Sequence, residues 1–310
     1  MTKAFFQKPN HKLLANFGRA QVDMHFHTRY SDSNVSVEKA LQKAKKMGIG
    51  LAITDHNEVE GALKAVENNE GVLVIPGIEV SCYEGPHILL YFYEPWDLKA
   101  FYENFLKNKR NGNPYMATKA TAEEILDEAS KYKCLRVAAH PYGYMTANSG
   151  LMKAMRKGYV PERLIEKVDG FEAICGAMNR YLNKRAANFA EKNNLMVTGG
   201  SDGHCLFQLG RVVTIADGTT REEFLDSIKE GNSMAIGKEP KVLTKILPAT
   251  STIRNHFPYT VPTVKLQSCM MVERARHFKG RLATKCINGG RVSRKVAVLP
   301  LKVIRRKQFK

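Results

Sequence analysis

Short apolar runs alternate with segments of helical spacing from residue 20 to about residue 237. In residues 20–26 apolar and polar side chains alternate, which predicts a β-strand. Residues 37–47 carry apolar side chains at helical spacing and stop at Gly48, and glycine commonly ends a helix. Repeated strand–helix alternation predicts an α/β fold with a parallel sheet. Further strands are predicted over residues 49–54, 72–78, 87–92, 135–139, 170–174, 195–198 and 211–215, and helices over residues 59–67, 97–107, 121–132, 181–192 and 221–230.

Polar side chains follow most of the predicted strands at their ends. Side chains at positions i and i+2 of a strand share one face, so His25 and His27 are expected to project together. Taken alone, these two could be unrelated polar residues at a strand end. In α/β barrels, however, functional residues gather at the carboxyl ends of the strands. The pattern therefore predicts one shared site, built from His25, His27, Asp55, His56, Glu79, His140, Asp202 and His204.

The candidate metal ligands are imidazoles and carboxylates, with no cysteine among them. This donor set suits Zn, Mn or Fe and differs from the thiolate-rich set of a structural zinc site. Each residue alone could be an ordinary buried polar residue, but the set is too large for one ion and predicts a multinuclear centre with a bridging carboxylate. His11, His256 and His277 have no comparable placement, and we assign them no role. The nine candidates are His25, His27, Asp32, His56, Glu79, His87, His140, Asp202 and His204.

Composition is ordinary for a folded soluble protein, with 44% hydrophobic and 25% charged residues in 310. No apolar run approaches the ~20 residues that cross a bilayer, so no transmembrane segment is expected. The N-terminus lacks a signal-peptide pattern. Six cysteines without a CxxC pair are expected to be reduced thiols in a cytoplasmic protein.

Positive charge is concentrated at the C-terminal end. Residues 238–310 hold 18 Lys and Arg against two acidic residues, a net +16, whereas residues 1–237 hold 30 basic and 28 acidic residues, a net +2. Such a segment is suited to contact nucleic-acid phosphates. Packing on the body with solvated charges is the next alternative, and an anionic membrane surface is the third.

Five motifs stand in order along the chain: Asp23-Met24-His25-Phe26-His27-Thr28 with Ser31-Asp32, Thr54-Asp55-His56-Asn57, Gly77-Ile78-Glu79-Val80-Ser81, Ala139-His140-Pro141 and Gly200-Ser201-Asp202-Gly203-His204. They resemble those of the PHP (polymerase and histidinol phosphatase) family of metal-dependent phosphoesterases. The resemblance covers about residues 20–237 and implies a distorted (β/α)7 barrel of the PHP type, with a trinuclear metal centre. We therefore expect a leader over residues 1–19 packed on the barrel, a PHP domain over residues 20–237 and a basic extension over residues 238–310.

The resemblance also implies how two to three divalent ions (Zn, Mn or Fe) would be shared. His87 enters through a looser motif, Pro86-His87-Ile88-Leu89. The first ion would be held by His25, His27, Glu79 and Asp202, the second by bridging Glu79, His87 and His140, and the third by Asp32, His56 and His204.

The implied reaction is hydrolysis of a phosphate ester by a metal-bridging hydroxide, which requires no serine or cysteine nucleophile. Glu79, Asp202 and His204 are the expected catalytic residues. Asp55 is expected to orient a neighbouring imidazole. Arg29, Arg180 and Arg211 are candidate substrate contacts, and each is alternatively a plain surface or rim cation.

The expected substrate is a nucleotide, a bisphosphonucleotide or an oligonucleotide end. A histidinol-phosphatase-like enzyme acting on a small metabolite is the main rival. From a different class, the barrel could be a metal-bound regulatory or binding module without catalysis. Loss of ligands would mark that module, and the sequence retains all nine.

Overall fold

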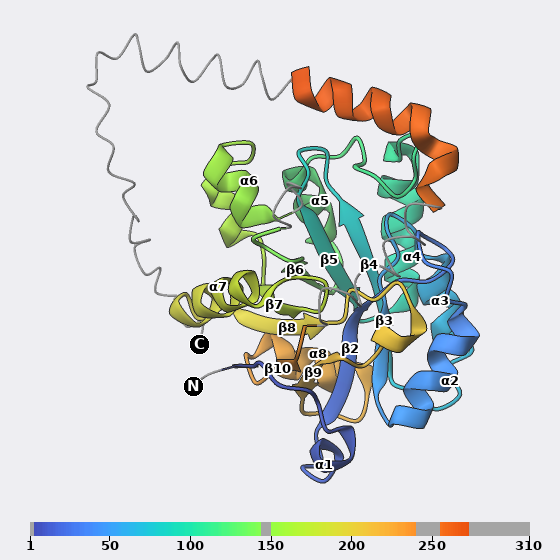
Figure 1. Cartoon of the computed structure of the whole chain (residues 1–310), viewed down its shortest axis with the longest axis vertical. Helices are drawn as coiled ribbons and strands as arrows, with labels where there is room; N and C mark the ends of the chain where they lie inside the picture. The colour runs from blue at the N-terminus through green and yellow to red at the C-terminus, as the bar shows by residue number, and fades with distance from the viewer. Residues whose placement is uncertain (1–2, 144–149, 240–254, 273–310) are drawn as a thin grey trace. The chain divides into compact units, whose positions relative to one another are not determined.

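A computed structural model of the chain describes residues 3–143, 150–239 and 255–272 (Figure 1). The chain divides into two units, Met1–Lys265 and Leu266–Lys310, and the sheet and the candidate ligands belong to the first. The predicted boundaries after residues 19 and 237 stay predictions. Among the described residues, no helix combines the length and apolar character needed to span a membrane.

Ten strands form one sheet in the order β1-β10-β9-β2-β3-β4-β5-β6-β7-β8, which curves into a nearly closed barrel. A bridge between Phe26 of β2 and Gly203, just beyond β8, brings the two ends of the β2–β8 set together. The predicted distorted α/β barrel is thus confirmed. The strands are β1 Ala4–Phe5, β2 Ala20–Phe26, β3 Gly50–Ile53, β4 Val74–Ser81, β5 His87–Phe92, β6 Cys134–Ala138, β7 Gly170–Cys175, β8 Met196–Gly200, β9 Val212–Ala216 and β10 Met234–Gly237.

The sheet is less uniformly parallel than the strand–helix alternation predicts. Strand β5 runs antiparallel to both β4 and β6, and β9 runs antiparallel to both β2 and β10. Only residues 82–86 join β4 to β5, and a parallel pair would need a crossover of a dozen residues or more. As a result His87, at the start of β5, lies opposite Ser81, at the end of β4.

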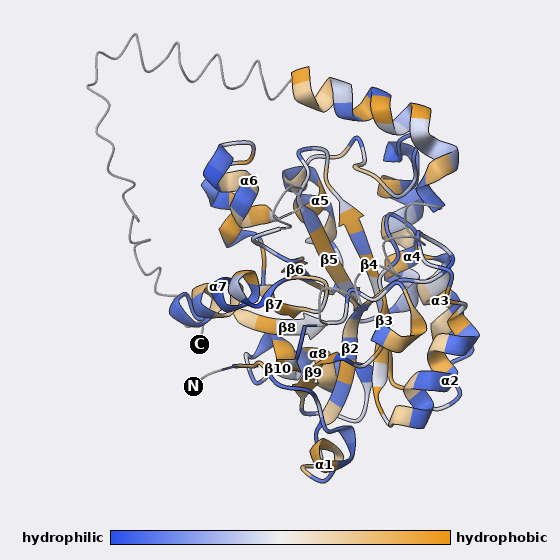
Figure 2. Ribbon diagram, in the orientation of Figure 1, coloured by the Kyte–Doolittle hydropathy of each residue, from blue (hydrophilic) through white to orange (hydrophobic). Residues whose placement is uncertain are grey.

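Helices cover the outside of the sheet and turn their apolar faces toward it (Figures 1 and 2). Helix α2 begins at the N-cap Ser36 and ends at Gly48, whose positive φ of 65° suits glycine. Helix α5 begins with the predicted capping box of Thr121 and Glu124. The labelled α-helices are α1 His11–Ala15, α2 Val37–Met47, α3 Glu60–Glu67, α4 Pro95–Phe101, α5 Ala122–Ala129, α6 Leu151–Lys157, α7 Arg180–Lys192 and α8 Arg221–Lys229. Residues 260–272 are helical as well.

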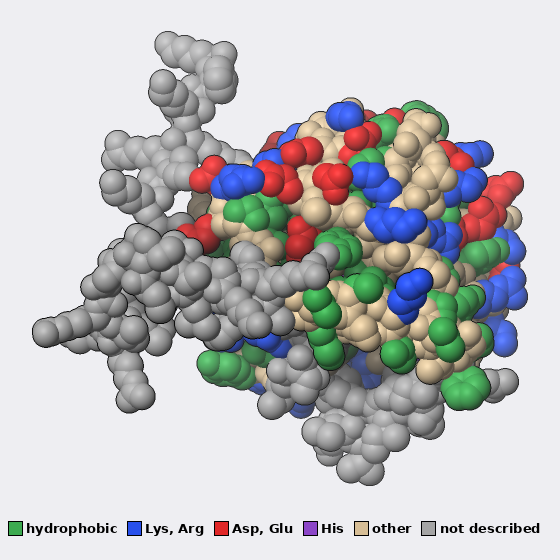
Figure 3. Space-filling model, turned by 90° about the horizontal axis from the view of Figure 1, so that it is seen from above, with side chains coloured by type: hydrophobic (Ala, Val, Ile, Leu, Met, Phe, Trp, Pro, Cys, Tyr) green, Lys and Arg blue, Asp and Glu red, His purple; other side chains and the backbone are tan. Residues whose placement is uncertain are grey.

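Two apolar clusters lie on opposite faces of the strands. Along β5, Leu89 and Tyr91 belong to the inner cluster, and the alternate residues belong to the larger outer cluster under the helices. The inner cluster also includes Phe224 of α8. The face seen from above carries interspersed acidic and basic side chains (Figure 3).

Strand β2 changes its register against β3 between Asp23 and Phe26. Met24 consequently belongs to the inner cluster, whereas Phe26 belongs to the outer one. The simple alternation of residues 20–26 therefore fails at this point. His25 and His27 still project together, with their Nε2 atoms 3.1 Å apart.

We expect Gly200→Ala to destabilise the fold strongly. A Cβ at Gly200 would lie 2.2 Å from the Cβ and 2.4 Å from the backbone nitrogen of His25, and backbone cannot move aside. The free energy of unfolding, measured with urea, should fall by about 3 kcal/mol or more. In the control Gly18→Ala, no heavy atom lies within 4 Å of the added Cβ, so only the positive φ of 68° adds a cost, about 1–2 kcal/mol. Equal losses in the two variants would contradict the close contact.

Candidate metal centre

The Glu79 carboxylate stands between two groups of imidazoles. Its Oε2 lies 2.9 Å from His56 Nδ1, 3.4 Å from His25 Nε2 and 3.5 Å from His27 Nε2. Its Oε1 lies 2.9 Å from Nδ1 of His87, at the start of β5, and 3.0 Å from Nε2 of His140, which follows β6. One carboxylate thus faces five imidazoles through both of its oxygens, the arrangement of a bridging ligand.

Asp202 completes the group around the two histidines of β2. Its Oδ1 lies 3.2 Å from His27 Nε2 and 3.6 Å from His25 Nε2. The loop after β8 is tied to β2 because the Asp202 N–H donates to the His25 carbonyl at 2.8 Å. The Gly203 carbonyl accepts from the His27 N–H at 3.0 Å.

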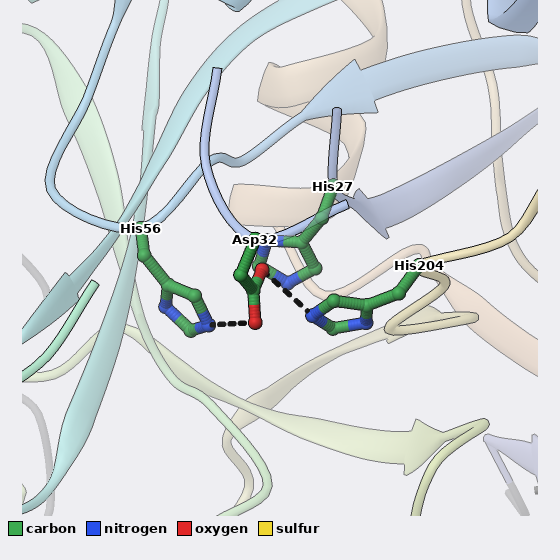
Figure 4. A group of neighbouring side chains, drawn as sticks. All are labelled: His27, Asp32, His56 and His204. Atoms are coloured by element: carbon green, nitrogen blue, oxygen red, sulfur yellow. Dashed lines mark ion pairs between the residues drawn. The ribbon is translucent and has the colours of Figure 1, made fainter. Parts of the chain in front are cut away.

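The third group gathers around Asp32 (Figure 4). Asp32 Oδ1 lies 3.0 Å from His204 Nε2, and its Oδ2 lies 4.0 Å from His56 Nε2. The ring of His27 stacks on that of His204 with centroids 4.3 Å apart. The structure therefore brings all nine candidates into one continuous cluster. Their assignment to individual ions stays a prediction.

The donor set fits divalent cations. Three subsets can each present one atom per residue within 4.8 Å of the others. His27 Nδ1 is buried without a hydrogen-bond partner among the described residues. The three carboxylates of the cluster are at most 3% exposed, and buried charge of one sign needs compensation. The three subsets whose ligand atoms lie within 4.8 Å of one another are His27, Asp32, His56 and His204; His25, His27 and Asp202; and His56, Glu79 and His87.

Electrostatics keeps the carboxylates ionised and His27 neutral. Burial would raise the pKa of Glu79, but the imidazoles of His56, His25 and His87 outweigh it and hold this pKa well below its usual range. Burial, reinforced by the neighbouring imidazoles, lowers the pKa of His27 to about 3. Ionised carboxylate and neutral imidazole are the forms that bind metal ions.

Two of the candidate ligands have left-handed backbone conformations. His140 has φ of 27° and Asp202 has φ of 48°. Aspartate tolerates this region, but histidine before a proline, here Pro141, normally adopts an extended conformation. Such local strain is typically held by the surrounding structure at functional sites. Here the His140 N–H donates to Glu172 Oε2 at 2.7 Å, which fixes the turn.

Two residues that the sequence interpretation missed support the ligands from behind. Glu172 of β7 accepts a hydrogen bond from His25 Nδ1 at 2.9 Å, which leaves Nε2 free to face the centre. The thiol of Cys175 donates to Asp202 Oδ2 at 3.4 Å. Burial, reinforced by Glu172 and Asp202, raises the pKa of this thiol well above its usual value, so it stays a donor. A carboxylate between Phe171 and Ala173 in an apolar strand is the feature that could have marked Glu172.

We expect Glu172→Gln to weaken metal binding by about 10- to 100-fold, because a neutral amide supports the His25 imidazole less well. Metal affinity would be measured by titration against a chelator of known strength. Glu222→Gln provides the control, since this exposed carboxylate pairs only with Lys133 among the contacts that the structure describes. Unchanged affinity in Glu172→Gln would contradict the supporting role.

Asp55 has a role other than the expected one. Its carboxylate accepts hydrogen bonds from the Thr28 N–H at 2.7 Å and from the hydroxyls of Thr28 and Ser31 at 2.6 Å each. It therefore holds the loop between His27 and Asp32 rather than an imidazole.

Asn57, two residues after Asp55, donates through Nδ2 to the carbonyls of Pro114 and Met116. These bonds anchor the loop of residues 111–117 beside the centre.

The three candidate arginines have other contacts in the structure. Arg29 is exposed on the first-motif loop, with its guanidinium 6.0 Å from the centre of the Tyr30 ring. Arg180 pairs with Glu239 at 2.9 Å. Arg211 lines a separate groove of about 950 Å³, to which none of the nine candidate ligands contributes. Substrate contact by these arginines stays a prediction.

Comparison with known proteins agrees with the geometry. The family model of the PHP domain matches residues 23–190, and that of the PHP-associated region matches residues 180–233. Over 65 residues the chain is 40% identical to the phosphoribosyl 1,2-cyclic phosphate 1,2-diphosphodiesterase of Eggerthella lenta. That match spans 20% of this chain and only 25% of the relative.

Two solved structures share the fold. One is a two-domain protein from Bacteroides vulgatus that contains a predicted PHP-like metal-dependent phosphoesterase, with a TM-score of 0.51, 17% identity, and coverage of 76% of this chain and 68% of that one. The other is Endonuclease Q in complex with a duplex that carries an abasic lesion at the active site, with a TM-score of 0.56, 20% identity, and coverage of 72% and 60%.

The PHP domain match spans more than half of the chain and contains four of the five motifs, and the fifth lies in the PHP-associated match. Bridges between Phe26 and Gly203 and between His56 and Glu79 bring motifs from distant parts of the chain together. The chain therefore belongs to the PHP domain family.

Proposed function

We propose that this protein hydrolyses a phosphate ester of a nucleotide, a bisphosphonucleotide or an oligonucleotide end, using two to three divalent ions held by the nine ligands. The observation that carries the proposal is the Glu79 carboxylate, with imidazoles against both of its oxygens. Ions in such a pair of sites polarise a phosphoryl oxygen and bring the pKa of a bound water toward neutrality. Glu79, Asp202 and His204 would then position the reacting groups.

Nucleic-acid-like substrates are favoured by two observations. Endonuclease Q, whose fold this chain shares, acts on DNA, and the relative from Eggerthella lenta is named as a phosphodiesterase of a phosphoribosyl compound. The basic segment of residues 238–310 offers positive charge that a small metabolite would not require. Arg29, Arg180 and Arg211 are proposed as additional substrate contacts. A histidinol-phosphatase-like activity is the alternative.

The test is a screen of phosphorylated metabolites, bisphosphonucleotides and short 5′-phosphorylated RNAs, with Mn²⁺ or Zn²⁺ present. Release of inorganic phosphate or of nucleotides from the nucleic-acid compounds supports the proposal, and selective hydrolysis of histidinol phosphate supports the alternative. Metal analysis accompanies the screen. Fewer than two tightly bound ions per chain would exclude the multinuclear mechanism and favour a binding module.

We also propose that the protein is located in the cytoplasm and that its basic extension, residues 238–310, contacts nucleic acid. Most of the extension lies outside the described residues. Binding of RNA and of anionic liposomes would be compared between the full chain and a chain ending at residue 272, across salt concentrations. A steeper salt dependence of RNA binding in the full chain supports nucleic acid. Equal binding by both chains would remove any anionic partner for residues 273–310.

A further inference from the structure

His256 lies beside the metal centre although it stands outside every motif and beyond the family matches, which end at residue 233. Its Nε2 is 3.7 Å from Asp32 Oδ2, and its side chain is 24% exposed. It belongs to the same unit as the barrel, Met1–Lys265. A separation of 3.7 Å exceeds a hydrogen bond, so the imidazole faces the Asp32 group without closing on it.

Two anchors hold the segment of residues 255–263 in this place. Asn255 donates through Nδ2 to the Asp32 carbonyl at 2.8 Å, on the loop that carries the Asp32 side chain. The ring of Tyr115 contacts the His256 ring edge-on at 5.4 Å and the Tyr259 ring at 5.6 Å. The position of the imidazole is therefore fixed from the loop of residues 111–117 as well as from the first-motif loop.

A chain of hydrogen bonds decides which nitrogen of His256 carries the proton. Asn113 Oδ1 accepts from the Tyr115 N–H at 3.0 Å, so its amide nitrogen is the donor group. That nitrogen donates to Thr263 Oγ1 at 2.9 Å, whose own hydroxyl donates to the Tyr259 carbonyl at 2.7 Å. The same Asn113 nitrogen lies 3.1 Å from His256 Nδ1, which must accept its second hydrogen. The neutral imidazole then bears its hydrogen on Nε2, the atom directed at the centre.

An N–H in that direction is a poor metal ligand and a good donor to an anion. A ligating imidazole must present a lone pair, which Nε2 lacks in this tautomer. A phosphate oxygen beside Asp32 would be an acceptor for Nε2–H, since hydrogen bonds to charged acceptors are the strong ones. We propose that His256 is a substrate-contacting residue that donates Nε2–H to a phosphate oxygen of the ester. This inference rests on the proposed function.

Inorganic phosphate is the probe, and its affinity would be measured by calorimetry on the metal-loaded full chain. His256→Ala should bind phosphate about 10- to 100-fold more weakly and raise KM for the ester in proportion, since one hydrogen bond to a charged group is lost. Bound metal should be unchanged. His256→Gln retains an amide N–H donor and should recover part of the affinity. His11→Ala is the matched control, since this imidazole bonds to Gln21 and the Gly210 carbonyl instead.

The tautomer gives a second readout that does not depend on turnover. In ¹⁵N–¹H spectra of the full chain, the histidine signals lost in His256→Gln should show the Nε2–H pattern. The opposite tautomer, loss of a metal ion in His256→Ala, or phosphate affinity equal to that of the unsubstituted protein would each overturn the inference. If the unsubstituted protein itself binds neither metal nor phosphate, the proposed function fails instead.

Discussion

Replacing Glu79 by glutamine is expected to remove most of the bound metal and most of the hydrolase activity together. The substitution keeps the size of the side chain but removes a buried charge that faces imidazoles through both oxygens, at 2.9–3.5 Å. Removing one partner from a buried charged group costs about 3–5 kcal/mol. That range corresponds to a factor of about 100 to several thousand in metal affinity or rate. Metal analysis after gel filtration and phosphate-release kinetics would be measured on the same preparation.

Glu84→Gln is a matched control for this substitution. Glu84 lies in the turn after β4, and its carboxylate accepts a hydrogen bond from the Ala122 N–H at 2.9 Å. Metal content and activity should stay within a few-fold of the unsubstituted protein, because this hydrogen bond joins Glu84 to the start of α5 and not to a candidate ligand. A Glu79→Gln protein that retains its full metal content and rate would show that this carboxylate bridges no ions.

Local sequence patterns predict the ends of a helix correctly where residues of the helix itself determine them. Helix α2 begins and ends as predicted because Ser36 caps its first turn and Gly48 accepts the left-handed conformation at its end. The capping box at Thr121 fixes the start of α5 in the same way. Such signals act within a few residues, so a single sequence contains them completely.

Elements whose existence depends on distant partners escaped the prediction. Strand β1 has two residues and pairs with β10, more than 200 residues later in the chain, and the sequence pattern predicts neither strand. The helical segment predicted over residues 97–107 proved to be α4 followed by a π-helical turn, Tyr102–Leu106. The antiparallel β5 was not foreseen because strand direction follows from connection length and sheet order, not from alternation.

The candidate centre likewise combines features that are local in sequence with contacts between distant residues. The ligand types could be read from residue identity at strand ends, and the structure places all nine together. The contacts that support the centre are not local, because Glu172 reaches His25 from 147 positions away and Asn113 reaches His256 from 143 positions away. The apolar strand around Glu172 marks this carboxylate as unusual but does not name its partner. Asp55 shows the limit most plainly. Its neighbour in sequence is His56, but its hydrogen-bond partners are Thr28 and Ser31.

Removal of metal is expected to destabilise the protein substantially. Without cations, the buried carboxylates of the cluster are opposed only by imidazoles. An ion present at 1,000 times its dissociation constant stabilises the fold by about 4.1 kcal/mol, and more than one ion is proposed. The Tm measured by calorimetry should therefore fall by roughly 10 °C or more after exhaustive chelation. Mn²⁺ or Zn²⁺ should restore it, and restoration should be weaker in Glu79→Gln.

This loss of stability should depend on pH in a defined direction. Burial lowers the pKa of His204, but the Asp32 carboxylate outweighs it and raises the pKa to about 9 in the metal-free chain, above the ordinary 6.5. The bound proton thus stabilises the metal-free fold fully below about pH 6.5, and this contribution is lost as the pH rises through about 9. Metal binding requires the deprotonated ligand, so the loaded protein does not share this loss. The Tm difference between loaded and metal-free protein should widen from about pH 6.5 to about pH 8.5, and a difference that narrows over this range would contradict the assignment of His204 as a ligand.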